Sequence, residues 1–182
     1  MRYYFNSSFS VGVANTANTH VITCNGIHDP DITFTGHQPR GRDQLHPLYD
    51  HHVVLGSKMV LRMTAKEGED VIPLNFGIAI RDSPSVSASP SDYMETRTVK
   101  SNVVSSANGS RTAIMKVNPA KWLGRSKPLA DPELKGSQTS NPTEQCYFHI
   151  FAYAQEATTV YYYNGYVDYI VAFIEPRQPG ES

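Results

Sequence analysis

Apolar and polar residues alternate along much of the chain with a period of two, which is typical of β-strands that have one buried face. The clearest alternation covers Val53–Ala65 and Val71–Arg81. Cys146–Ala154 is apolar on both faces, which is the pattern of a central strand between two packed layers. Val160–Glu175 is the longest run, and its odd-numbered residues form a nearly continuous apolar face. Gly165 within this run predicts a bulge or kink rather than the end of the strand.

Four further stretches have weaker strand patterns: Tyr3–Val13, Thr19–Gly26, Thr96–Val104 and Arg111–Val117. Apolar stripes at the 3.6-residue spacing of a helix are missing, and only a short helical turn near Pro119–Leu123 is expected. About eight strands separated by long polar loops predict an all-β sandwich or barrel. Of these loops, Asp82–Tyr93 is rich in Ser and Pro, so we expect it to form a flexible, exposed tip.

Length and composition favour a single domain over residues 1–182, long enough to bury a substantial core. The charged fraction of 18% is low, as in a subunit that hides much of its surface against copies of itself. Cys24 and Cys146 both lie in apolar runs, which favours buried free thiols over the alternative of one disulfide. No apolar run has the length of a membrane span and no signal peptide begins the chain, so we expect no membrane insertion.

The formal net charge is −1, but the charges are unevenly placed. Residues 96–130 contain seven basic residues and no acidic residue, and they also contain the single tryptophan, Trp122. Cations around an aromatic side chain are typical of proteins that hold single-stranded nucleic acid by phosphate contacts and base stacking. The candidate nucleic-acid residues are Arg97, Lys100, Arg111, Lys116, Lys121, Trp122, Arg125 and Lys127. The alternative is that Trp122 packs at a strand end and the basic residues form a solvated surface.

The loop Ile27–Asp50 is rich in His and Asp, which are common metal ligands. No pair in it has the spacing of a known metal motif, so we expect Asx turns and hydrogen-bonded loop histidines instead. The chain also lacks a Gly-x-Ser-x-Gly elbow and a Gly-rich phosphate loop. We therefore expect neither an enzyme nor a bound cofactor or metal. The tyrosines near the C-terminus are placed with a period that favours core and interface packing over base stacking.

Several segments, taken in their order along the chain, resemble a known family. The first is the polar loop, which reads Asn25-Gly26-Ile27-His28-Asp29-Pro30-Asp31, Gly36-His37-Gln38-Pro39-Arg40-Gly41, Leu48-Tyr49-Asp50 and Gly56-Ser57-Lys58. The later ones are Lys121-Trp122-Leu123-Gly124 with Asp131, Ser140-Asn141-Pro142 before Cys146-Tyr147-Phe148-His149-Ile150, and Tyr166-Val167-Asp168-Tyr169-Ile170-Val171-Ala172-Phe173 before Glu175-Pro176. Together they resemble capsid proteins of circovirus-like viruses with circular single-stranded DNA genomes. No single segment is specific for this family, but the occurrence of all of them in the family's order over Asn25–Pro176 is specific.

The resemblance implies a single jelly roll of two four-stranded antiparallel sheets with long loops. It also implies self-assembly into an icosahedral T=1 shell of about sixty copies, which encloses the viral DNA. The virion is then the expected location, with assembly in the host nucleus, and the receptor on the host cell stays unknown. The polar loop would supply subunit contacts through His28, Asp29, His37, Gln38, Arg40, Arg42 and Tyr49.

Such proteins usually begin with an arginine-rich arm that binds the genome and carries the nuclear import signal. This sequence has no such arm, so we expect it to represent the shell domain alone, with weakened or absent DNA binding and no import signal. The alternative is a virus that packages its genome in a different way. Two alternatives remain at this point. One is a cellular, lectin-like jelly-roll binding module that uses the polar loop as a ligand cradle. The other is a metal-dependent, cupin-like enzyme that uses histidines of that loop.

Overall fold

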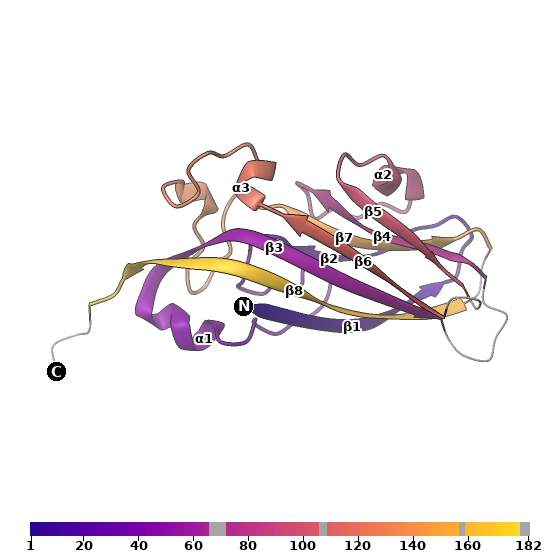
Figure 1. Ribbon diagram of the computed structural model, residues 1–182, viewed down its shortest axis with the longest axis horizontal. Coiled ribbons are helices and arrows are strands. Elements are labelled where there is room, and N and C mark those ends of the chain that lie inside the picture. The colour runs from indigo at the N-terminus through magenta and orange to yellow at the C-terminus, as the bar shows by residue number, and fades with distance from the viewer. Residues whose placement is uncertain (66–71, 106–108, 157–158, 179–182) are drawn as a thin grey trace.

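The computed structural model describes residues 1–65, 72–105, 109–156 and 159–178, which form two four-stranded antiparallel sheets packed face to face (Figure 1). The first sheet has the order β1-β8-β3-β6, and the second has the order β2-β7-β4-β5. The strands are β1 (Arg2–Val11), β2 (Asn18–Thr23), β3 (Tyr49–Ala65), β4 (Leu74–Arg81), β5 (Val99–Val104), β6 (Ser110–Val117), β7 (Tyr147–Ala154) and β8 (Thr159–Pro176). This is a jelly roll, so the predicted fold class is confirmed. Val71, the first residue of one predicted strand, lies outside the described residues.

The helices of the described residues are short. They are α1 (Arg42–Leu45), α2 (Pro90–Met94) and α3 (Pro119–Trp122), with single 3₁₀ turns at His46–Leu48 and Pro132–Leu134. The predicted turn near Pro119–Leu123 is α3, whereas α1 and α2 were not predicted. None of the described helices is long and apolar enough to cross a membrane.

The core lies between the two sheets and is built from the alternate residues that the sequence pattern indicates. On β8, Tyr161, Tyr163, Val167 and Tyr169 are buried, while Tyr162 points outward and is 52% exposed. The central strand β7 is buried on both faces, as predicted. Both cysteines are free and fully buried, which agrees with the expectation of buried thiols. Burial raises the pKa of the Cys24 thiol well above its usual value, which keeps it unreactive.

The predicted bulge at Gly165 is wrong. The pairing register runs through this residue without a shift, with Phe5 opposite it on β1 and Leu61 opposite it on β3. The irregularity of this strand pair lies instead between Val54 and Gly56 on β3. Gly165 is needed for space, because a Cβ atom there would lie 2.2 Å from the Val60 carbonyl oxygen.

Most residues of the segment Asp82–Tyr93 are exposed, as expected, but the segment is anchored to the second sheet and is not a free tip. It ends in α2, and Tyr93 is fully buried with its ring stacked on Phe151 of β7 at a centroid distance of 5.1 Å. The Tyr93 hydroxyl accepts hydrogen bonds from the Thr19 hydroxyl and the Ser87 backbone N–H. This segment therefore covers the outer face of the second sheet, which explains why β7 is buried on both faces.

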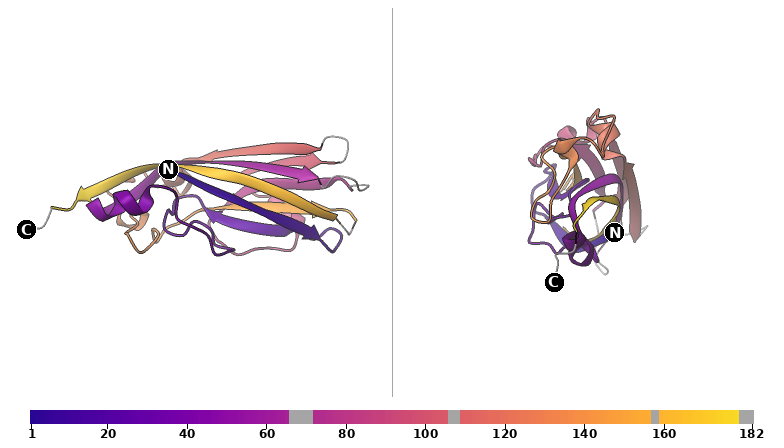
Figure 2. Two further views of the ribbon diagram at one scale, coloured as in Figure 1. Left: turned by 90° about the horizontal axis from the view of Figure 1, so that it is seen from below. Right: turned by 90° about the vertical axis from the view of Figure 1, so that its left-hand side faces the viewer.

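The polar loop Ile27–Asp50, called the contact loop from here on, first runs beside β2, where the Ile32 backbone N–H donates to the Val21 carbonyl. It then continues to α1, at the end of the sandwich where the C-terminus lies (Figure 1). The C-terminal part of β8 extends beyond the sheet there and pairs with the start of β3, Tyr49 opposite Pro176 (Figure 2). Next to it lies α1, within the long loop that follows β2. The contact loop therefore reaches from the side of β2 to this end of the molecule.

Candidate nucleic-acid site and contact loop

The short helix α3 positions the single tryptophan. Asn118 precedes the helix, and its side-chain oxygen accepts a hydrogen bond from the Lys121 backbone N–H at 2.9 Å, while Pro119 occupies the first helical position. Trp122 is half-buried and packs against the edge of the main core, and its indole N–H donates to the Thr98 hydroxyl at 3.4 Å. One part of the side chain is therefore structural, as the packing alternative for Trp122 proposed, while the rest lines a pocket.

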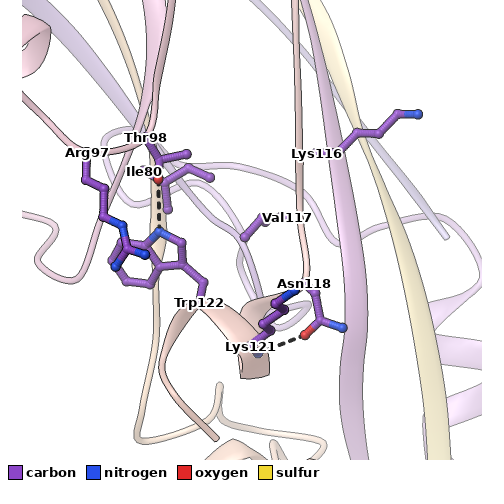
Figure 3. A pocket seen from close by; sticks show the side chains of 8 residues that line it. All are labelled: Ile80, Arg97, Thr98, Lys116, Val117, Asn118, Lys121 and Trp122. Carbon is purple, nitrogen blue, oxygen red and sulfur yellow. Dashed lines mark hydrogen bonds between the residues drawn. The ribbon is translucent and has the colours of Figure 1, made fainter.

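This pocket has a volume of about 260 Å³ and lies where α3 meets the end of β6 and the residues before β5. Of the eight predicted nucleic-acid residues, it brings together Arg97, Lys116, Lys121 and Trp122. Figure 3 shows the Arg97 side chain beside the indole, whereas Lys116 points away from Trp122. The arrangement combines a partly exposed aromatic ring with nearby cations, which suits one base and its phosphate.

Arg125 lies outside this pocket and its charge is balanced. Its guanidinium forms ion pairs with Asp131 and Glu133 and lies 3.6 Å from Glu144. The hydrogen bond that Arg125 donates to Glu133, together with the negative charges of Glu133, Asp131 and Glu144, raises the pKa of Arg125. The acid-free character of residues 96–130 is therefore true of the sequence but not of the surface, because acids from the following segment surround Arg125.

The remaining predicted cations are dispersed. Lys127 is exposed beside Arg125, and Lys100 and Arg111 lie on β5 and β6, the edge strands of the two sheets. The eight residues therefore do not form one continuous site.

The contact loop is ordered by a buried polar network that the sequence analysis missed. His20 of β2 is 1% exposed, and its Nε2 lies 2.8 Å from the carboxylate of Asp31 in the loop. Burial by itself would raise the pKa of Asp31, but the hydrogen bonds from His20, Phe34 and Tyr3 together lower it. The Tyr163 hydroxyl bonds the other nitrogen of His20 at 2.8 Å, and burial raises the pKa of Tyr163 to about 12. The network joins the loop to both sheets.

The predicted contact residues divide into exposed and buried ones. Asp29, His37 and Arg40 are exposed, while His28, Gln38 and Tyr49 are half-buried. The Gln38 side-chain oxygen accepts from the Asp29 backbone N–H, and the His37 ring packs on Tyr3.

Arg42 differs from the other predicted contact residues because it is only 4% exposed. Its guanidinium donates to the Gln138 carbonyl and to Asp43, and it lies 3.2 Å from His28 Nδ1. Arg42 therefore supports the loop from inside and is not offered on the surface of this chain.

Exposed apolar side chains are also gathered in this loop. Ile32, Phe34, Leu45 and Leu48 are 43%, 50%, 43% and 58% exposed. Large apolar side chains grouped on a surface are typical of contact regions between proteins. Within the described residues, no group of three or more His, Cys, Asp or Glu side chains is arranged to hold a metal ion.

Comparison with known proteins identifies the fold. No protein-family model matches the chain, and no curated protein matches it in sequence. Among solved structures, the capsid protein of BFDV, crystallised as a decamer, is 14% identical, with a TM-score of 0.50 over 96% of this chain and 98% of that one. A Broad Bean Stain Virus structure is 10% identical, with a TM-score of 0.51 over 100% and 93% of the two chains. A Kashmir bee virus virion chain is 10% identical, with a TM-score of 0.54 over 97% and 74%. The chain therefore has the jelly-roll fold of viral capsid proteins.

Proposed function

We propose that this chain is a capsid protein that self-assembles into an icosahedral shell and has no catalytic role. The observation that carries the proposal is the likeness to the BFDV capsid protein, which extends over nearly the whole of both chains. A match of this extent leaves no room for a separate catalytic domain within the compared region. We further propose that residues 1–182 act as a single shell domain.

Our proposal for the type of genome rests on the sequence, because the fold does not decide it: structures with this fold come from several different viruses. The segments between Asn25 and Pro176, and their order along the chain, resemble circovirus-like capsid proteins, which supports a circular single-stranded DNA genome. On this proposal, about sixty identical copies form the simplest closed shell, T=1, with assembly in the host nucleus.

Assembly would proceed through the contact loop. The exposed apolar residues of this loop belong to the same segment of the chain as the exposed predicted contact residues Asp29, His37 and Arg40. Burial of such apolar area against a neighbouring copy stabilises each contact weakly, by about 25 cal/mol per Å² of apolar surface. A closed shell repeats the contact in every copy, so the sum of weak contacts becomes stable.

Within the shell, the pocket beside Trp122 is a candidate contact for the enclosed strand. Arg97 and Lys121 would contact phosphate, and the open part of the indole would stack on a base. We leave Arg125 out of this site because its charge is already paired.

Negative-stain microscopy of the purified chain at neutral pH tests the proposal, together with the ratio of absorbance at 260 and 280 nm on the same fraction. Uniform hollow particles support a shell protein, and the ratio shows whether they hold nucleic acid. A monodisperse monomer or small ring at every salt concentration and pH would contradict the proposal and favour a jelly-roll binding module.

A further inference from the structure

The outer face of the first sheet carries a regular array of side chains. The strand registers place them in four cross-strand rows: Arg2, Asp168, Lys58 and Lys116; Tyr4, Tyr166, Val60 and Ile114; Asn6, Asn164, Arg62 and Thr112; Ser8, Tyr162, Thr64 and Ser110. The residues between them along each strand, such as Phe5 and Leu61, are buried in the core, so the array faces away from the sandwich.

The array has an excess of positive charge. Its charged members are four cations and one carboxylate, and that carboxylate, Asp168, is paired with Arg2 at 2.6 Å. Lys58, Arg62 and Lys116 form no ion pair with any residue that the structure describes. This face is therefore cationic on a chain whose formal net charge is −1, and it is complementary to an anionic partner.

The same face presents aromatic rings. Tyr4 and Tyr162 are 51% and 52% exposed, and between them lies a hollow of about 410 Å³. Asn6 and Asn164 line this hollow, and their amides can both donate and accept hydrogen bonds. A third tyrosine, Tyr166, is already covered, because the Arg2 guanidinium lies 3.9 Å from its ring centroid.

This face is also the open one of the two. The outer face of the second sheet is covered by the chain itself, since Tyr93 of α2 packs on Phe151. In Figure 1 the first sheet is turned toward the viewer, and none of the described helices crosses it. A polymer can therefore lie along the rows of the first sheet.

We propose that the outer face of the first sheet binds single-stranded nucleic acid without reading its sequence. Tyr4 and Tyr162 stack on unpaired bases at the hollow, and Lys58, Arg62 and Lys116 contact phosphates of the same strand. The inference rests on the proposed function for the identity of that strand as the enclosed genome. A second copy of this chain fits the face less well, because a symmetric contact would set its unpaired cations against their own copies.

The test is fluorescence anisotropy of a labelled oligothymidine titrated with the intact chain. The substitutions Tyr4→Ala and Tyr162→Ala, made together, should weaken binding by about tenfold or more. Their matched control, Tyr4→Phe with Tyr162→Phe, keeps the rings and should bind as the unchanged chain does. Equal loss in the Phe pair, or no loss in the Ala pair, would overturn base stacking at this face.

The cations are tested in the same assay at several salt concentrations. Each phosphate contact to a single strand contributes about 0.7 to the slope of log K against log salt, so Lys58→Gln with Arg62→Gln should reduce that slope by about 1.4. Lys135→Gln with Arg177→Gln removes the same charge from residues paired with Glu175 and Asp50, and should leave the slope unchanged. The same slope change in both pairs would show an effect of net charge alone and overturn the site.

Particle formation, followed by light scattering and microscopy, separates this inference from the proposed function. Particles that form normally while the sheet variants bind oligothymidine unchanged would overturn the inference alone. Tyrosine-dependent binding by a chain that forms no particles would support the inference and contradict the shell. Sheet variants that lose particles but keep binding would show a contact between copies, which also overturns the inference.

Discussion

Nε2 of His46 lies 2.8 Å from Nδ1 of His52, and both imidazole rings are fully buried. The pair joins the turn after α1 to β3, and the Phe173 ring packs edge-on against His46. Burial, followed by the nearby charge of Arg42, lowers the pKa of His46. Burial and then the charges of His46, Arg42, His28 and His51 lower the pKa of His52 to about 3. The folded chain therefore holds this pair neutral.

This pair predicts that the free energy of unfolding falls on acidification. The unfolded histidines bind protons near pH 6.5, whereas His52 in the folded chain does so only near pH 3. Between these values the unfolded state holds more protons than the folded state. The free energy of unfolding therefore decreases by about 1.4 kcal/mol for each pH unit of acidification and each such histidine. His149, with its pKa lowered by burial to about 4, acts in the same direction. Urea unfolding at pH 7 and pH 5 measures the loss.

His52→Gln removes one titrating group and should make the dependence less steep between those two pH values. Carboxylates with a lowered pKa, such as Asp31, also make the folded chain less stable on acidification, but only below about pH 4, where the unfolded carboxylates begin to bind protons. A chain with the same urea midpoint at pH 7 and pH 5 would contradict the neutral buried pair.

The close approach at Gly165 predicts a large effect from a single methyl group. In Gly165→Ala the new Cβ would lie 2.2 Å from the Val60 carbonyl oxygen and 2.7 Å from the Phe5 ring. The strands must separate to admit it, so we expect a loss of about 1–3 kcal/mol in the free energy of unfolding. Gly12→Ala is the matched control, since nothing lies within 4 Å of the corresponding Cβ. Equal stability of the two variants would show that β1 and β8 do not pack as described.

Tyr169 and its neighbour Ile170 test the assignment of inner and outer faces on β8. Tyr169 is 2% exposed and its hydroxyl donates to the Thr23 carbonyl, whereas Ile170 is 67% exposed. Tyr169→Asp places an unpaired charge in the core and should abolish folding. Ile170→Asp, one residue further, should give soluble protein with an unchanged near-ultraviolet circular dichroism spectrum. Native-like protein from Tyr169→Asp would mean that the two faces are exchanged.

The alternation of apolar residues was sufficient to predict the strands and their inner faces, because burial on one side of a strand imposes a period of two. It predicted that the odd-numbered residues of β8, Tyr169 among them, form the apolar face, without any knowledge of the partner strands. It did not predict why Gly165 is required, since the Val60 carbonyl and the Phe5 ring reach it from two other strands. A glycine required for space and a glycine at a bulge look the same in the sequence.

The site was less predictable because its electrostatics depend on residues distant in sequence. Arg125 was assigned to a basic surface, but Asp131, Glu133 and Glu144 follow the window that defined that surface. Tyr93 was placed in an exposed loop because α2 has only five residues, and its packing on Phe151 is a tertiary contact. The rows of the first sheet require the register of four strands, which no periodicity supplies.

The buried pair of His20 and Asp31 predicts that the contact loop depends on one carboxylate. Asp31→Asn removes the charge while keeping the shape, and hydrogen bonds to a charged group contribute about 1.5–3 kcal/mol each. Asp29→Asn is the control, because Asp29 is exposed and Asn tolerates its positive φ of 53°. We expect the control to change the free energy of unfolding by less than about 0.5 kcal/mol. Urea unfolding of the two variants gives both values, and equal values would contradict a structural role for the pair.

The fluorescence of Trp122 can report on binding at the pocket beside α3. It is the only tryptophan of the chain, and its indole lines the pocket with Arg97 and Lys121. If a base stacks there, adding oligothymidine should quench the tryptophan fluorescence, and Arg97→Gln with Lys121→Gln should weaken the quenching by about tenfold, as expected when phosphate contacts are lost. Both residues are exposed, so this double variant should keep the thermal unfolding midpoint of the unchanged chain.

Arg125→Glu is unsuitable as a variant in this test, because it would set a fourth carboxylate among Asp131, Glu133 and Glu144. Oligothymidine that binds by anisotropy without quenching Trp122 would place the strand on the outer sheet face alone and exclude the pocket.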